Sequence, residues 1–148
     1  GYGLSYTTFE YKNLQVNSEA QTTDESVEVT FQIKNTGQVA ADEIAQIYLS
    51  PTSASQQIRP IQLQGFARVA LNPGETRTVT TRLYIEQLGF YSHQGERQWN
   101  IQPGTFTIKV GASSTDIRLQ SQITLKGKPV NKPIRDYYFS ESMVSARK

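Results

Sequence analysis

The sequence contains no cysteine, and among its 148 residues it has one histidine, one tryptophan and one methionine. Without cysteine there is no disulfide framework, no thiolate metal site and no cysteine nucleophile. A single histidine without cysteine or clustered acids argues against a transition-metal site. Apolar runs span only a few residues, far short of the roughly 20 that a membrane-spanning helix needs. We therefore expect no metal and no membrane partner.

The formal net charge of +2 hides an uneven distribution. Residues 1–125 carry nine Lys and Arg against eleven Asp and Glu, whereas residues 126–148 carry six against two. A nucleic-acid-binding face would need basic residues gathered on the folded body, with aromatics between them. Because the basic excess belongs to the tail, we expect no nucleic-acid partner.

What the chain does have is the composition of a β-rich globular domain. Hydrophobic residues make up 36%, charged residues 19%, and there are eight Tyr and six Phe. Tyr and Phe favour strands. A chain of this length buries roughly 70% of its unfolded surface, so it is expected to fold alone.

Apolar and polar residues alternate with period two, the spacing of half-buried strands. The clearest stretch is 27–34, and the turn signals Asn35-Thr36-Gly37, Asn72-Pro73-Gly74-Glu75 and Gln102-Pro103-Gly104 separate such stretches. Residues 85–89 form at most one helical turn. The pattern predicts an all-β fold: an antiparallel immunoglobulin- or fibronectin type III-like β-sandwich of seven or eight strands in residues 1–125. An irregular extension, 126–148, follows.

The sequence shows no evident catalytic group. Hydrolysis by two carboxylates needs them roughly 5 to 10 Å apart across one cleft. Asp24-Glu25 and Asp42-Glu43 are neighbours in sequence, and neighbours on a strand point to opposite faces, so neither pair forms such a dyad by itself. The alternative is a dyad assembled from distant loops. His93 is either a general base or a solvated turn residue, and its polar flanks favour the second. No glycine-rich phosphate loop is present, so we expect no cofactor.

Seven motifs recur in an order that resembles a known family. They are Gly1-Tyr2-Gly3-Leu4-Ser5-Tyr6-Thr7-Thr8-Phe9, Asn35-Thr36-Gly37, Asp42-Glu43-Ile44-Ala45-Gln46-Ile47-Tyr48-Leu49-Ser50, Arg59-Pro60, Leu63-Gln64-Gly65-Phe66, Pro73-Gly74-Glu75-Thr76 and Pro103-Gly104-Thr105-Phe106. Together they resemble the C-terminal fibronectin type III-like domain of family 3 glycoside hydrolases, the β-glucosidases and β-xylosidases. The resemblance covers about residues 1–125 and not the tail from Gly127 onward.

This resemblance implies that the catalytic residues lie elsewhere. In the family, the nucleophilic Asp and the acid/base residue belong to domains upstream of the first motif, so neither maps onto this sequence. The chain is expected to be a catalytically inert segment of a longer protein. That parent would be a retaining, exo-acting glycosidase without a cofactor, and the resemblance favours a periplasmic or secreted location.

The candidate interdomain contacts begin with the aromatic entry formed by Tyr2, Leu4, Tyr6 and Phe9. In a whole enzyme these side chains would pack the sandwich against the preceding domain. The alternative is that they complete the sandwich's own edge, because buried Tyr is common in both settings.

Two loops are further candidates for contact. The loop 51–62, with Arg59 before Pro60, is longer than an ordinary hairpin turn and is predicted to face the catalytic domains, unless Arg59 is simply a solvated charge. The segment Tyr91-Ser92-His93-Gln94-Gly95 either touches a partner or an oligosaccharide, or forms a hairpin tip.

The tail combines features of an extended strap and of a docked segment. Pro129 and Pro133 alternate with basic residues and lead into Tyr137-Tyr138-Phe139. Proline and charge favour an extended chain, whereas three aromatics favour docking. We expect the tail to lie along the sandwich or a neighbouring domain.

Three functional classes remain open from the sequence. The first is an accessory structural domain whose partners are the catalytic domains of a family 3 glycosidase. The second is an independent carbohydrate-binding module, which would need an exposed aromatic platform, but Trp99 alternates with Gln98 and Asn100 and is predicted to face the core. The third is a generic adhesion-type sandwich.

Overall fold

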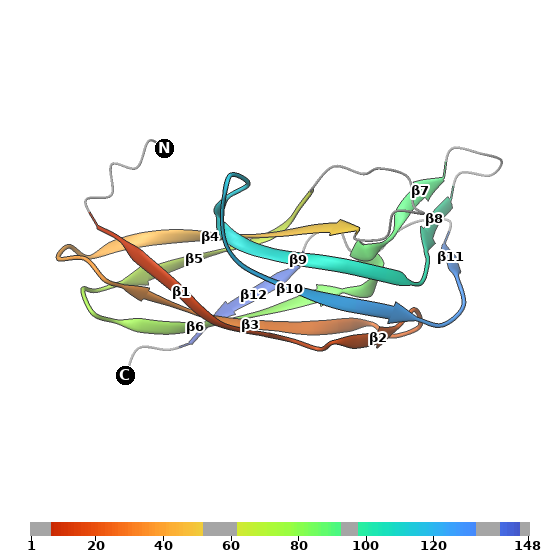
Figure 1. Ribbon diagram of the computed structural model, residues 1–148, viewed down its shortest axis with the longest axis horizontal. Coiled ribbons are helices and arrows are strands. Elements are labelled where there is room, and N and C mark those ends of the chain that lie inside the picture. The colour runs from red at the N-terminus through yellow and green to blue at the C-terminus, as the bar shows by residue number, and fades with distance from the viewer. Residues whose placement is uncertain (1–6, 52–61, 93–97, 133–139, 146–148) are drawn as a thin grey trace.

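The computed structural model describes residues 7–51, 62–92, 98–132 and 140–145. Figure 1 shows the arrangement of its strands and of one short 3-10 helix. In chain order the elements are β1 (Phe9–Val16), β2 (Glu19–Gln21), β3 (Ser26–Asn35), β4 (Ala41–Pro51), β5 (Gln62–Leu71), β6 (Thr76–Tyr84), η1 (Ile85–Leu88), β7 (Phe90–Ser92), β8 (Gln98–Ile101), β9 (Gly104–Ser113), β10 (Asp116–Lys126), β11 (Val130–Lys132) and β12 (Glu141–Val144).

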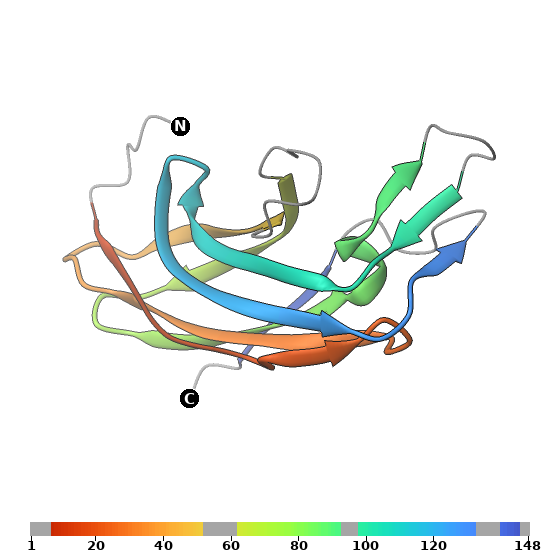
Figure 2. The same cartoon turned by 45° about the vertical axis from the view of Figure 1, so that its right-hand side comes forward.

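Two large sheets form the layers of a sandwich. Sheet A has the order β1-β3-β6-β12 and sheet B the order β2-β10-β9-β4-β5, while β11-β8-β7 form a small sheet at one end (Figures 1 and 2). Among the described strand pairs, β2 with β10 is parallel and the others are antiparallel. The predicted antiparallel β-sandwich is confirmed.

The strand count depends on strand length. Seven strands have eight or more residues, and the other five have three or four. The seven long strands match the predicted seven or eight. Of the five short strands, β8 contains the predicted alternation around Trp99. The other four have three or four residues each, too few to display a period in the sequence.

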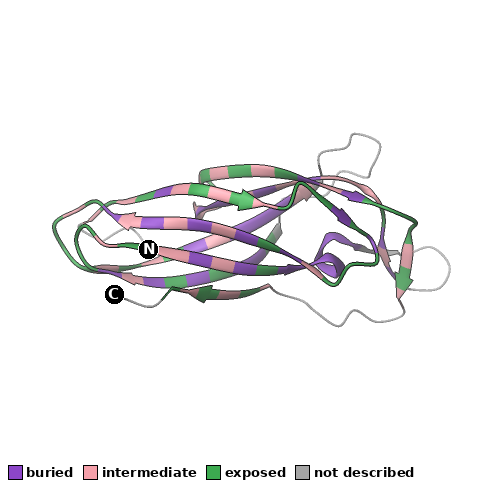
Figure 3. Ribbon diagram, turned by 90° about the horizontal axis from the view of Figure 1, so that it is seen from below, coloured by how far each residue is buried: buried purple, intermediate pink, exposed green. Residues whose placement is uncertain are grey.

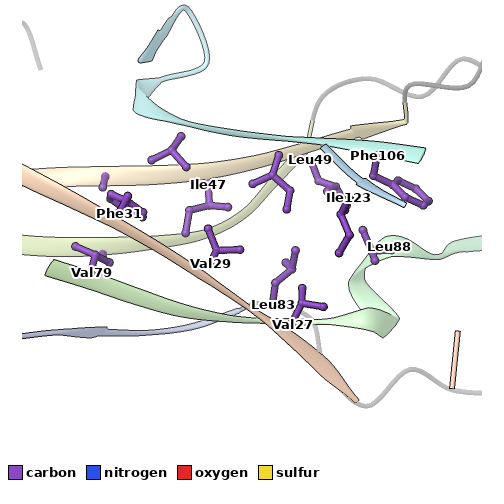
Figure 4. Close-up of a cluster of buried hydrophobic side chains, with 14 of the residues drawn as sticks. Val27, Val29, Phe31, Ile47, Leu49, Val79, Leu83, Leu88, Phe106 and Ile123 are labelled. Carbon is purple, nitrogen blue, oxygen red and sulfur yellow. The ribbon is translucent and has the colours of Figure 1, made fainter. Parts of the chain in front are cut away.

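The core lies between the two sheets and is filled by alternate side chains of the long strands. In β3, Val27, Val29, Phe31 and Ile33 are buried and alternate with more exposed polar residues. Figure 3 shows this banding along the strands. Figure 4 shows Val29 and Phe31 of sheet A and Ile47 of sheet B in one cluster between the two sheets. Such alternation buries one face of each sheet and leaves the other to solvent.

The turn predicted at residues 85–89 is the 3-10 helix η1, and it joins the sandwich to the small sheet. Trp99 of β8 is buried, as predicted, and its indole Nε1 donates a hydrogen bond to the carbonyl of Glu86 at 2.7 Å. The Nζ of Lys132 on β11 lies 2.8 Å from the buried Glu86 carboxylate. These contacts anchor the small sheet on η1.

The described part of the tail lies along the sandwich. β11 pairs with β8, and β12 pairs with β6 as the edge strand of sheet A. Ser140 donates to the Gln64 carbonyl through its backbone N at 2.9 Å and its Oγ at 3.2 Å. A Cβ on Gly65 would meet the Ser140 hydroxyl at 1.8 Å, so this crossing needs glycine. Tyr137-Tyr138-Phe139 lie outside the described residues.

Candidate interdomain surface

Most of the predicted contact residues lie outside the described part of the chain. This is the case for Tyr2, Leu4, Tyr6, Arg59, Pro60 and His93. The backbone of Tyr91 belongs to β7 and pairs with Trp99, while its side chain is not described. Phe9 begins β1, is half-buried and packs against the core of its own sandwich. The interdomain role of these residues therefore stays a prediction.

The first described residues lie against the turn between β3 and β4. The Thr7 hydroxyl donates to Asn35 Oδ1 at 2.7 Å, and the hydroxyls of Thr8 and Thr36 are 2.7 Å apart. A Cβ on Gly37 would lie 1.9 Å from the Thr7 hydroxyl, so Thr7 packs directly on the Gly37 backbone. The chain thus enters the sandwich at the end where β4 begins.

A cluster around Tyr11 ties β1 to β4 and β10. The Tyr11 hydroxyl donates to Glu43 Oε2 at 3.0 Å, and the Arg118 guanidinium carbon lies 5.5 Å from the Tyr11 ring centroid. Arg118 also donates from Nε to Asp116 Oδ1 at 2.6 Å and from Nη1 to the Phe9 carbonyl at 3.0 Å. The cluster fastens the edge strand of sheet A to sheet B.

The electrostatics of this cluster are structural rather than catalytic. Burial, followed by the neighbouring Glu43 carboxylate, raises the pKa of Tyr11 far above its usual value, so the phenol stays protonated and acts as a fixed donor. The hydrogen bond from Arg118 lowers the pKa of Asp116. Asp42 and Glu43 do point apart as predicted, since Asp42 pairs with Arg68 at 2.8 Å and Glu43 with Tyr11.

Replacing Tyr11 with phenylalanine tests the cluster through its pH dependence. At pH 7 we expect a loss of about 1 to 2 kcal/mol of unfolding free energy, because a hydrogen bond to a carboxylate disappears. The folded-state pKa of Tyr11 is raised, so the contribution of the phenol is present below its unfolded pKa of about 10 and is lost as pH rises beyond it. Urea unfolding at pH 7 and pH 11 should therefore show the difference between the two proteins shrinking. A difference that is constant with pH would contradict this.

The outward side of β4 and β5 carries apolar side chains where solvent is expected. Ile44 is 47% exposed, Leu63 41% and Phe66 61%. In the strand register Ile44 lies opposite Arg68, Gln46 opposite Phe66, and Tyr48 opposite Leu63. We call Ile44, Gln46, Tyr48, Leu63 and Phe66 the β4–β5 face.

Tyr48 behaves differently from its neighbours on this face. It is only 8% exposed, yet it is not part of the core cluster, and its hydroxyl donates to Gln46 Oε1. Gln46 is half-buried. The Tyr48 hydroxyl and the Gln46 amide oxygen are therefore hydrogen-bonded to each other, and Gln46 lies opposite the exposed Phe66.

Sequence reasoning did not identify the β4–β5 face. Ile44 is an apolar residue on the same outward side of β4 as Gln46 and Tyr48. An apolar residue at an outward position of an alternating strand is the signal that was available.

Other kinds of site find no support in the described ranges. No group of three or more His, Asp or Glu side chains is placed to hold a metal ion among them. The helical content of the same ranges includes nothing long and apolar enough to cross a bilayer.

Comparisons with known proteins identify the domain type. A family model described as a fibronectin type III-like domain matches residues 43–114. β-Glucosidase BoGH3A of Bacteroides ovatus is 40% identical over 80% of this chain and 16% of its own length, and a putative β-xylosidase of Formosa agariphila is 38% identical over 82% and 16%. The chain thus spans about a sixth of the length of these relatives.

Solved structures agree with the sequence comparisons. β-Glucosidase 3B of Thermotoga neapolitana in complex with glucose superposes with a TM-score of 0.73, at 34% identity over 88% of this chain and 17% of that one. The fold, the family model and the relatives point to one assignment. The chain belongs to the fibronectin type III-like domains carried by family 3 glycoside hydrolases, the β-glucosidases and β-xylosidases.

Proposed function

We propose that the chain acts as a non-catalytic accessory domain that packs against the catalytic domains of a family 3 glycoside hydrolase. The parent enzyme would hydrolyse terminal β-glycosidic bonds with retention. The observation that carries the proposal is the coverage: at least four fifths of this chain matches relatives named as β-glucosidases and β-xylosidases, but it accounts for only about a sixth of their length.

Four of the described carboxylates have partners that fit an inert domain. Asp42 pairs with Arg68, Glu43 with Tyr11, Asp116 with Arg118, and Glu86 with Lys132. Each of these carboxylates has a local structural partner. A retaining glycosidase instead needs two carboxyl groups roughly 5 Å apart across a sugar-sized cleft.

The carbohydrate-binding alternative has less support. Trp99 is buried, and Phe66 is the one aromatic among the exposed large hydrophobic side chains in the described residues. A single phenylalanine does not make a flat sugar-stacking platform. The predicted contact of an oligosaccharide with residues 91–95 stays a proposal, because His93 lies outside the described residues.

Activity assays test the proposed function directly. The purified chain is expected to release no nitrophenol from aryl β-glucoside or β-xyloside above background, whereas the product of the longer coding sequence is expected to do so with retention. Calorimetry of the chain with cello- and xylo-oligosaccharides should show no saturable binding. Turnover by the isolated chain, free of contaminating enzyme, would overturn the proposal.

A further inference from the structure

The β4–β5 face is the apolar exception on the outer side of sheet B. Three of the five exposed large hydrophobic side chains in the described residues lie on it, namely Ile44, Leu63 and Phe66. On the neighbouring strands of the same sheet the corresponding outward positions are polar: Thr107, Lys109, Gln120 and Gln122. The apolar side chains therefore form a patch rather than a scatter.

The outer side of sheet A shows what a solvent-facing sheet of this protein looks like. Its outward positions pair polar with polar residues across β3 and β6, such as Glu28 with Arg82 and Thr30 with Thr80. Antiparallel sheets with one wet face follow this pattern. A contiguous exposed apolar patch instead marks a surface that meets a partner.

We infer that the β4–β5 face docks on the catalytic part of the same polypeptide, with the Phe66 ring as its central anchor. This inference rests on the proposed function, which supplies the partner: more than four fifths of each relative's length lies outside the region that this chain matches. A large exposed aromatic beside a nearly buried Tyr48 has the form of an interface hot spot.

The path of the chain favours a partner attached at the N-terminal side. Thr7 and Thr8 lie against the β3–β4 turn, and β4 starts from that turn at Ala41. Ile44 is three residues further along, about 10 Å at the rise of a strand. A domain joined upstream of Thr7 is therefore delivered close to the β4–β5 face, and such a tether supplies a high effective concentration.

The composition of the face fits contact between domains better than a dimer of this chain. An apolar centre of three side chains is bordered by the Asp42–Arg68 ion pair, with Lys109 on the next strand. Interfaces between domains of one chain are more polar than obligate dimer interfaces, which resemble a core cut in half. The mixed border therefore argues against a stable homodimer through this face.

Hydroxyl-radical footprinting with mass spectrometry tests the docking. The oxidation rate of Phe66 is measured in this chain alone and in the longer enzyme, with Met143 as the internal reference. Met143 is 74% exposed and lies on β12 of the opposite sheet. Docking predicts that Phe66 oxidation slows about tenfold in the longer enzyme, as expected for a buried anchor, while Met143 oxidation stays within about twofold.

A matched pair of variants provides the second measurement. Phe66→Asp and Met143→Asp both place a charge at an exposed position, so neither is expected to shift the melting temperature of the chain alone. In the longer enzyme, Phe66→Asp is expected to raise the rate of proteolytic release of the domain about tenfold, because a charge then has to be buried at the interface. Met143→Asp is expected to leave that rate unchanged.

The outcomes separate the docking from the proposed function. Phe66 that oxidises equally fast in both proteins would overturn the docking, and a longer enzyme that still cleaves β-glycosides would then keep the proposed function standing. A longer product without glycosidase activity would overturn both. Protection of Phe66 in the chain alone that increases with concentration would assign the face to a second copy and would also overturn docking within one chain.

Discussion

Asn35→Asp is expected to lower the free energy of unfolding by about 3 kcal/mol at pH 7, because it turns a donor into a charge inside the sandwich. Asn35 is fully buried, and its Nδ2 donates to the carbonyls of Val39 at 2.9 Å and Leu71 at 3.1 Å. A carboxylate has no proton to donate, so both carbonyls would face a negative oxygen. The accepting contacts from Thr7 and Gly37 survive, and the loss therefore reports on the donor side.

The pH dependence gives this prediction its sign. The new carboxyl would have a raised folded-state pKa, so the protonated form is favoured and the loss of stability is smallest below the unfolded pKa of about 4. The loss grows as pH rises through that range to neutrality. Urea unfolding of both proteins at pH 4 and pH 7 measures it.

Asn13→Asp is the matched control for this experiment. Asn13 is exposed and has a φ of 58°, a conformation that Asp tolerates about as well as Asn. Its substitution is expected to change stability by less than about 0.5 kcal/mol. An Asn35→Asp variant that is no less stable than Asn13→Asp would show that the Asn35 amide is not a structural donor.

The long strands could be predicted because their alternation is local. Residues 27–34 show both the apolar face of β3 and its wet face within eight residues, and the structure buries that apolar face. The pairing of β12 with β6 could not be predicted, because it joins residues 141–144 to residues 79–82 and depends on contacts distant in sequence. The four residues of β12 do not indicate in their own sequence which strand they pair with.

The β4–β5 face could not be predicted from the sequence, because β5 contains an irregularity. Leu63 and Phe66 are three residues apart, so period two would place them on opposite faces, yet both are exposed. The register of β5 against β4 shifts between Ile47 and Tyr48, which leaves Gln64 as an extra residue and restores Leu63 to the face of Phe66. Sequence alternation cannot show a face that depends on a bulge.

The glycine that follows this extra residue has two roles that the sequence alone does not separate. Gly65 lies in the Leu63-Gln64-Gly65-Phe66 motif, so its recurrence could be attributed to the turn chemistry of a loop. In the structure it is a strand residue without a positive φ, and what it provides is room for Ser140 of the tail. The motif therefore contains both the exposed Phe66 and the glycine that makes room for the tail.

Truncating the chain after Lys126 is expected to lower the free energy of unfolding by about 3 to 5 kcal/mol, from several lost hydrogen bonds partly offset by the entropy of the released tail. The truncation removes the ladder of β12 on β6 and the ladder of β11 on β8. It also removes the Ser145 carbonyl, which accepts from Arg77 at 2.9 and 2.6 Å, and the Lys128 carbonyl, which accepts from Thr22 at 2.6 Å. Urea unfolding of both chains measures the loss, and the newly exposed edge of β6 is expected to promote aggregation, visible by light scattering.

Two single substitutions on β12 show whether the strand itself provides this stability. Val144 packs against the core, whereas Met143 points to solvent, so Val144→Asp is expected to cost about 2 kcal/mol and Met143→Asp less than about 0.5. Equal effects of the two substitutions would mean that β12 is not held by its inner face. A truncated chain as stable as the full one would place the end of the folded unit at the end of β10. The expected losses would instead show that β12 stabilises sheet A, the layer opposite the β4–β5 face.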